Sequence, residues 1–266
     1  MPITEQAILE ALDSKLFLSA DYPESISVPL NIEGVYGVRS VQSANADANF
    51  VGFTRLTEDN VLDTIEAVQA VYDAHGHQFL WSVSDLSTPS TLTQHLESAG
   101  FVKAFDLVGM VRNNLQPTIT VHPNIRVRIA TDDDFDAVNR LYRDAYPLNE
   151  DEVQARYQSM QALGGHDYLA YVVGKHQPVS VASMFYERDD PIATLQGAAT
   201  LEAYRGKGLY TALVAHRIEV ARRDGIEAVV LQAISATSAP ILARLSFEKT
   251  LDISFYRSPI STNLQK

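Results

Sequence analysis

Apolar residues recur along the chain with the two periods that mark strands and helices, and the second half shows the clearer pattern. Three runs of strand length lie between turn residues, at residues 167–173, 179–186 and 192–201. Residues 209–223 then place apolar side chains three and four positions apart and end on Asp224-Gly225, which predicts an amphipathic helix. A buried strand is also expected at 227–232, and a last strand contains Tyr256.

The first half repeats the later part of this pattern, in which a helix, a strand and a second helix follow one another. The match becomes visible when Gly76 is aligned with Gly225, because residues 57–59 then fall opposite residues 206–208. We interpret this as a weak internal repeat, whose copies are separated at residues 113–124, where prolines interrupt the periodicity. The elements expected in the first half are helices at 1–18, 60–74 and 89–98 and strands at 25–30, 35–41, 49–53 and 77–83.

The stretch from Ala198 to Thr211 has the composition of a phosphate-binding turn between a strand and a helix. Gly206 and Gly208 lack a Cβ, so the backbone can take positive φ and turn successive amides toward one point. The helix N-terminus adds a partial positive charge, and Arg205 and Lys207 add full ones. The spacing lacks the third glycine of a dinucleotide fingerprint and the Lys-Ser or Lys-Thr pair of a P-loop.

The run Arg-Gly-Lys-Gly-Leu-Tyr at residues 205–210 resembles the acyl-CoA motif of the GNAT superfamily, Gln/Arg-x-x-Gly-x-Gly/Ala, in which only Tyr210 departs from the pattern. The resemblance covers residues 124–257, with Ser246 in place of the family's glycine before Phe247. It implies the family's first strand at 125–131, a first helix that starts at 132–135, and its short helix at 239–245. Together with the repeat, it implies an α/β fold with a mixed sheet and two GNAT-like acyl-CoA N-acyltransferase domains in tandem. The domains expected are a degenerate GNAT-like domain over 1–116 and a GNAT acetyltransferase domain over 124–266.

This resemblance implies acetyl-CoA as the cofactor and direct transfer of its acetyl group to an amine of a small molecule or a peptide terminus. In the family, backbone amides of the strand before the motif polarise the thioester carbonyl, and this strand pairs with the pantetheine arm. The cofactor-binding residues implied here are Ala198, Ala199, Thr200, Arg205, Gly206, Lys207, Gly208, Leu209, Tyr210 and Thr211.

The catalytic side chains that GNAT relatives use are absent from the corresponding positions of this sequence. The tyrosine position upstream of Phe247 holds Leu242, and the carboxylate positions on two strands hold Thr194 and Val230. General acid–base catalysis contributes about 10²–10⁴ in rate, so the loss of these side chains would slow the reaction without abolishing it. We therefore assign no catalytic residue and keep a catalytically silent acyl-CoA-binding or sensing protein as the alternative. The substitutes considered are Tyr256, His166 and Glu187, each of which is more typical of packing or solvent contact.

The counterpart turn in the first half, Leu56-Thr57-Glu58-Asp59, has no glycine and carries two carboxylates where a pyrophosphate would lie. Acidic residues in this place are typical of helix N-termini, and we expect them to cap the helix that follows. The first half is therefore expected not to bind coenzyme A. We expect it to cover the second domain and to form one wall of the acceptor pocket.

Composition limits the ligands and the cellular location that are expected for this chain. A formal net charge of −12 argues against nucleic-acid binding and is compatible with a cationic amine acceptor. The chain has no cysteine, no apolar run of membrane-spanning length and no signal-peptide pattern in residues 1–20, so a cytoplasmic protein is expected. His75-x-His77 lacks a third ligand nearby, so no metal site is expected. The oligomeric state stays open, a homodimer included.

Overall fold

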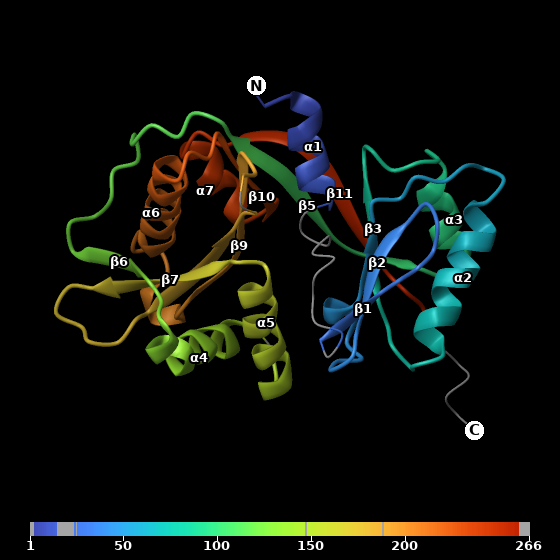
Figure 1. Ribbon diagram of the computed structural model, residues 1–266, viewed down its shortest axis with the longest axis horizontal. Helices are drawn as coiled ribbons and strands as arrows, with labels where there is room; N and C mark the ends of the chain where they lie inside the picture. Colours follow the sequence, from blue (N-terminus) through green and yellow to red (C-terminus); the bar gives the residue numbers. More distant parts are fainter. Residues whose placement is uncertain (1–2, 15–23, 25, 147, 188, 261–266) are drawn as a thin grey trace.

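The computed structural model describes residues 3–14, 24, 26–146, 148–187 and 189–260, and the strands of this part form one mixed sheet (Figure 1). The sheet order is β1-β2-β3-β4-β11-β5-β10-β9-β8-β7-β6. The first half contains α1 (Glu5–Ser14), β1 (Ser27–Pro29), β2 (Tyr36–Ser40), the 3-10 helix η1 (Ala46–Ala48), β3 (Phe50–Gly52), α2 (Val61–Asp73), β4 (Leu80–Ser84), α3 (Leu92–Ser98) and β5 (Val102–Arg112).

The second half follows the same order after an additional strand and two helices. It contains β6 (Ile125–Ile129), η2 (Asp132–Asp134), α4 (Phe135–Ala145), α5 (Glu150–Ala162), β7 (His166–Val172), β8 (Ser180–Phe185), β9 (Ile192–Thr200), η3 (Glu202–Tyr204), α6 (Leu209–Arg223), β10 (Ala228–Ile234), α7 (Ser238–Arg244) and β11 (Glu248–Arg257). No helix of the described residues is long and apolar enough to cross a bilayer.

The predicted elements are present, and α6 has the bounds expected from its local signals. The repeat is visible in the backbone as well, because Gly76 after α2 and Gly225 after α6 have φ of 71° and 81°. Gly100 after α3 and Ser246 after α7 also share the left-handed conformation. The expected helix over 1–18 is α1, which ends at Ser14, and residues 15–18 lie outside the described part of the chain.

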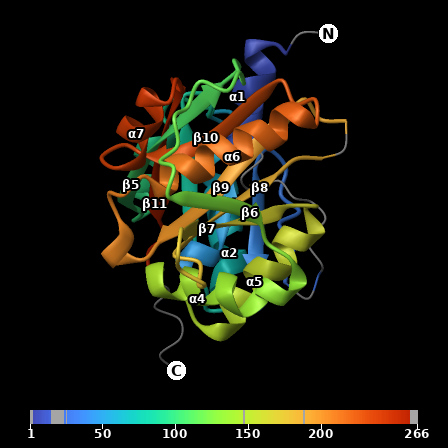
Figure 2. The same cartoon turned by 90° about the vertical axis from the view of Figure 1, so that its left-hand side faces the viewer.

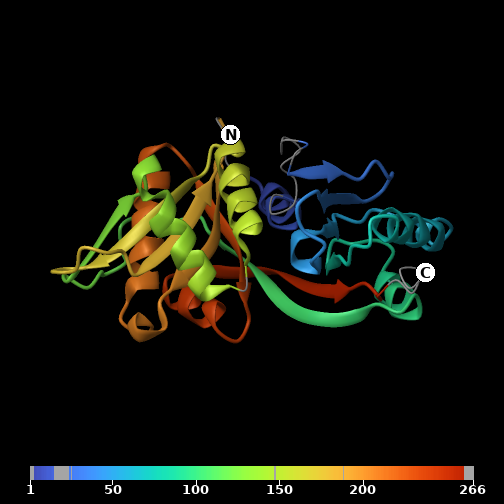
Figure 3. The same ribbon diagram turned by 90° about the horizontal axis from the view of Figure 1, so that it is seen from below.

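The two halves exchange their last strands. β5 lies between β10 and β11, and β11 lies between β4 and β5, so each half of the sheet is extended by a strand from the other half. Figure 3 shows the long green β5 and red β11 running side by side between the two lobes. The strand β5 was not expected from the sequence, because its first residues are exposed on both faces and its last ones are buried on both, which leaves no alternation.

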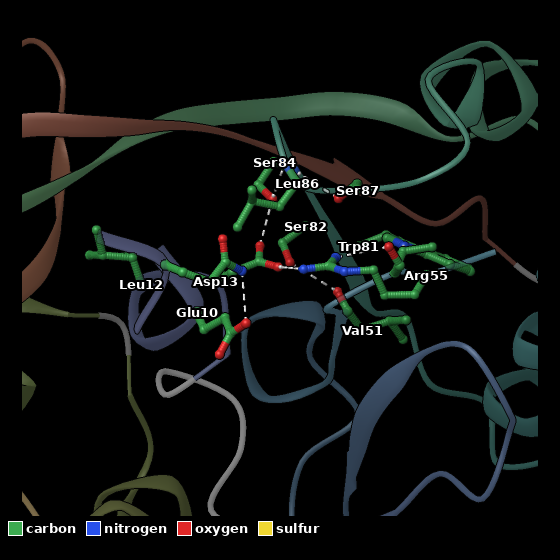
Figure 4. A network of polar contacts seen from close by, with 12 residues as sticks. Glu10, Leu12, Asp13, Val51, Arg55, Trp81, Ser82, Ser84, Leu86 and Ser87 are labelled. Carbon is green, nitrogen blue, oxygen red and sulfur yellow. Dashed lines mark hydrogen bonds and ion pairs between the residues drawn. The ribbon is translucent and has the colours of Figure 1, made fainter. Parts of the chain in front are cut away.

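Helix α1 packs where the exchanged strands cross. Leu12 lies over Gly109 of β5, where an added Cβ would come within 3.1 Å of the Leu12 side chain and 2.9 Å of Leu251 Cβ. The buried Asp13 carboxylate accepts hydrogen bonds from Ser84 Oγ at 2.6 Å and Arg55 Nη2 at 2.9 Å (Figure 4). The side chain of Gln232 in β10 donates to the Leu12 carbonyl at 2.9 Å, so α1 binds both halves.

Both faces of the second-half sheet are covered by helices (Figure 2). Helix α6 packs one face through a core that includes Leu213 and Ile218, and α4 packs the other through Val138 and Leu141. Helix α5 lies on the same side as α4 and faces the first half (Figure 1). A cavity lies between α4, α5 and the first half.

Candidate active site

Strands β9 and β10 separate in the middle of the second-half sheet. Their parallel pairing runs from Ile192 to Thr194 on β9 and ends at Val230 on β10. Beyond this point β10 continues along β5, while Leu195 to Thr200 have no strand partner on that side among the described residues. The result is an opening along the edge of β9, where backbone groups that do not pair with β10 can bind an extended ligand.

The open part of β9 carries a bulge at Gly197. Ser183 of β8 pairs with Gln196 and Ala182 pairs with Ala198, so Gly197 is the extra residue on β9. Its φ of 42° is left-handed, and an added Cβ would lie 3.2 Å from Tyr142 Oη. A bulge turns backbone groups out of the ladder, and this one brings the β9 backbone against the Tyr142 phenol.

The glycine loop joins the open end of β9 to α6. Gly206 and Gly208 have φ of 73° and 83°, as the phosphate-binding prediction requires. Gly208 is the N-cap of α6 and supplies no side-chain cap, so the first amides of the helix have no side-chain acceptor from it. Arg205 and Lys207 are exposed, and the Arg205 guanidinium donates to the Thr200 carbonyl at 3.1 Å.

Tyr210, which departs from the motif, points into the protein. Its ring packs against the core beneath α6 together with Leu209, and burial raises the pKa of its phenol. The loop surface above it is formed by Gly206 and Gly208, where an added Cβ would meet open space or only Ile125 at 3.7 Å. The bulky residue therefore leaves the loop open.

The corresponding turn of the first half is closed by its own side chains. Asn60 Oδ1 accepts from the Thr57 amide at 2.8 Å, and the Glu58 carboxylate accepts from Thr91 Oγ1 at 2.7 Å. His95 Nε2 lies 3.3 Å from the same carboxylate, and these hydrogen bonds hold the pKa of Glu58 below its usual value. The expectation that Glu58 caps α2 is wrong, because its carboxylate reaches across to α3 instead.

A cavity of about 510 Å³ lies between the two halves and reaches the bulge. The second half contributes its floor and one side, and the first half closes the opposite side from β1, β2 and the region around η1. Its lining includes Ser43, Asn45 and Asp47 from the first half and Tyr142, Tyr146, Glu152, Arg156, Ser183, Gln196 and Gly197 from the second.

Glu152 of α5 joins the two halves at the mouth of this cavity. Its carboxylate accepts from Ser43 Oγ at 2.6 Å and Asn45 Nδ2 at 2.8 Å in the first half. It also accepts from the Asn149 amide at 2.9 Å, which forms a capping box at the start of α5. Partial burial acts to raise the pKa of Glu152, but these three hydrogen bonds outweigh it and lower the pKa.

A buried polar network lies at the floor of the cavity. Tyr142 Oη and Ser183 Oγ are 2.7 Å apart, and Ser183 Oγ is 2.5 Å from Asp167 Oδ1. Arg156 Nη2 binds Asp167 Oδ2 at 2.7 Å, while its guanidinium stacks 3.8 Å from the centre of the Tyr142 ring. Tyr146 donates to the Ala198 carbonyl at 2.8 Å. The helical spacing of Tyr142 predicts only a core position, and its approach to Ser183 and Gly197 depends on three distant segments.

Comparison with known proteins identifies the second half. Residues 135–243 match the family model described as Acetyltransferase (GNAT) family. These residues form a domain of the GNAT acetyltransferase family. No protein among those with curated annotation matches the chain.

Solved structures match the fold over most of the chain. A GCN5-related N-acetyltransferase from Kribbella flavida is 15% identical, with a TM-score of 0.70 over 90% of this chain and 91% of that one. A tandem GNAT protein from the clavulanic acid biosynthesis pathway is 11% identical, with a TM-score of 0.65 over 85% of this chain and 78% of that one. A functionally unknown protein from Staphylococcus epidermidis is 14% identical, with a TM-score of 0.66 over 88% and 95%. At these identities the likeness shows the fold, which is a tandem GNAT architecture.

The substitutes considered for the missing GNAT acid and base lie away from the cavity. Tyr256 is buried in the first-half core and pairs with Trp81, as its packing interpretation predicts. His166 and Glu187 are exposed and do not line the cavity. Leu242, in the usual tyrosine position, is fully buried in the core of the GNAT half.

Proposed function

We propose that the chain is an N-acetyltransferase that moves an acetyl group from acetyl-CoA directly to the amine of a small molecule. The observation that carries the proposal is the continuity of three features: the glycine loop, the open edge of β9, and the cavity that meets this edge at Gly197. A pyrophosphate at the loop would place an extended pantetheine arm along β9. The thioester would then reach the bulge beside the cavity.

The proposed cofactor site uses backbone groups for most of its contacts. Gly206, Gly208 and the first amides of α6 would hold the pyrophosphate, and Arg205 and Lys207 would offset its charge. The open edge of β9 would pair with the pantetheine amides like an added strand, and an amide at the bulge would polarise the carbonyl. The residues proposed are Ala198, Ala199, Thr200, Arg205, Gly206, Lys207, Gly208, Leu209, Tyr210 and Thr211, with Tyr210 acting through its backbone.

The cavity supports a small-molecule acceptor. Its volume of about 510 Å³ falls in the range of small-ligand sites, roughly 300–1,000 Å³. Two carboxylates, Asp47 and Glu152, line it; Asp47 lies 3.6 Å from Arg257 Nη2, and the guanidinium of Arg156 is paired with Asp167. This balance, with the net charge of −12, favours an amine that carries positive charge in solution.

The proposed division of the chain is a first domain over 1–116 and a GNAT acetyltransferase domain over 124–266. The closed turn at Glu58 supports a first domain without a cofactor site. Its proposed role is to supply β5 to the second half and to close the acceptor cavity.

The test is to incubate the protein with acetyl-CoA and a panel of small amines and to follow free thiol, with a control that lacks amine. We expect amine-dependent thiol release and an acetylated product detected by mass spectrometry. The buried Leu242 and the absence of the family's carboxylates favour the silent acyl-CoA-binding protein as the second candidate. Tight coenzyme A binding without turnover across the panel would support that candidate and contradict the transferase.

A further inference from the structure

The hydrogen bonds around Ser183 have a fixed direction. A serine hydroxyl carries one proton, and the Asp167 carboxylate at 2.5 Å can only accept, so the proton of Ser183 lies toward Asp167. Arg156 Nη1, at 3.3 Å, also donates to Ser183 Oγ. Tyr142 Oη, at 2.7 Å, must therefore donate its proton to Ser183.

This direction leaves the lone pairs of Tyr142 Oη available. Within the described residues, the phenol oxygen has no hydrogen-bond partner other than Ser183. Tyr142, Ser183 and Gly197 all line the cavity, and the phenol lies against the β9 bulge. An amine in the cavity that approaches the thioester at the bulge can donate an N–H to this oxygen.

An amine that attacks a thioester must lose a proton, and the side chains that GNAT relatives use for this step are absent here. Resting on the proposed function, we propose that Tyr142 Oη takes this proton and relays it through Ser183 Oγ to the Asp167 carboxylate. This assigns Tyr142 as a catalytic residue, with Ser183 and Asp167 acting through it.

Three proton transfers make up the relay. The neutral amine nitrogen bonds to the thioester carbonyl carbon and gives a proton to Tyr142 Oη. The phenol proton moves to Ser183 Oγ, and the serine proton moves to Asp167 Oδ1, which becomes a carboxylic acid. When the C–S bond breaks, the electron pair leaves on the coenzyme A sulfur, and the same chain returns the proton to that thiolate. The products are the amide and the free thiol.

Charged and titratable groups surround Tyr142 from every packed element. Arg156 of α5 stacks on its ring, the ring of Tyr146, just after α4, stacks with its centre 6.2 Å away, and Asp167 of β7 completes the relay. Arg217 of α6 is fully buried beneath and donates to the Ser183 carbonyl at 2.6 Å. Burial raises the pKa of Tyr142 and outweighs the guanidinium of Arg156, so the phenol is neutral at rest and can pass a proton on.

The test compares Tyr142→Phe with Tyr168→Phe. Both rings are buried, but the hydroxyl of Tyr168 in β7 has no hydrogen-bond partner in the described part of the chain, and Tyr168 does not line the cavity. We expect Tyr142→Phe to lower kcat about 10²–10⁴-fold and to remove the plateau of kcat at high pH, since hydroxide must then take the proton. Ser183→Ala should act in the same direction. Tyr168→Phe should leave kcat and its plateau at high pH unchanged.

Two binding measurements separate this proposal from the function on which it rests. Calorimetry should show unchanged coenzyme A affinity in Tyr142→Phe and about 5–10-fold weaker binding of the acceptor amine, since one hydrogen bond is lost. If the unmodified protein is active and Tyr142→Phe changes kcat by less than about threefold with the same pH profile, the relay is overturned but the proposed function is not. No turnover with any amine in the unmodified protein overturns the proposed function, and the relay with it.

Discussion

The loops that precede α6 and α2 occupy equivalent places in the repeat but are built in opposite ways. In the second half, Gly206 and Gly208 are left-handed, and a Cβ added to either would meet open space or only Ile125 at 3.7 Å. In the first half, Asn60 satisfies the Thr57 amide, and Glu58 extends to Thr91 and His95 of α3. Two copies of the same fold therefore need not bind the same ligand, because phosphate binding depends on a few residues of the loop.

The largest effect is expected at Gly208. In Gly208→Val the φ of 83° would strain the backbone by about 1–3 kcal/mol, and the side chain would cover the loop. We expect coenzyme A binding to weaken at least about tenfold in calorimetry. Gly174→Val is the matched control, because its φ of 85° imposes similar strain in open space in the β7–β8 turn. Equal affinity in the two variants would contradict the site.

Separating the halves should have the next largest effect. Residues 124–266 alone lack β5, so β10 and β11 would lose the strand that lies between them. We expect this piece to be insoluble or unfolded by circular dichroism, whereas residues 101–266, which include β5, should regain structure. A folded 124–266 piece that binds coenzyme A would show that the strand exchange is dispensable.

Glu152 tests the contact between the halves through pH. Its pKa is lowered in the folded protein, so its stabilisation is present above the unfolded pKa, about 4.3, and is lost as pH falls below it. Glu152→Gln keeps the size but loses the charge, and we expect its Tm at pH 7 to be about 2–4 °C lower. The difference from the unmodified protein should shrink toward pH 3. A difference that is constant with pH would argue against an ionised Glu152.

The smallest effect is expected in the first-half turn. Glu58→Ala with Asp59→Ala removes the two carboxylates and should lower Tm only slightly, because the contacts of Glu58 with Thr91 and His95 are exposed. The coenzyme A stoichiometry measured by calorimetry should stay at one per chain. A second site in this variant would mean that charge alone had kept the first half from binding the cofactor.

Local signals account for what the sequence could predict. The bounds of α6 follow from Gly208 and Asp224-Gly225, and the left-handed glycines of the loop follow from their spacing. The place of β5 could not be read, because it is decided by pairing with β10 and β11 far along the chain. Tyr142 looks like a core residue in sequence and is buried, and only the fold brings Ser183, Asp167 and Gly197 to its hydroxyl.

Hydrogen exchange of the intact chain, with and without coenzyme A, tests in one experiment whether the loop of the second half alone holds the cofactor. We expect slower exchange of amides in residues 197–213 and unchanged exchange in residues 56–62. Protection of residues 56–62, or none in residues 197–213, would contradict this expectation.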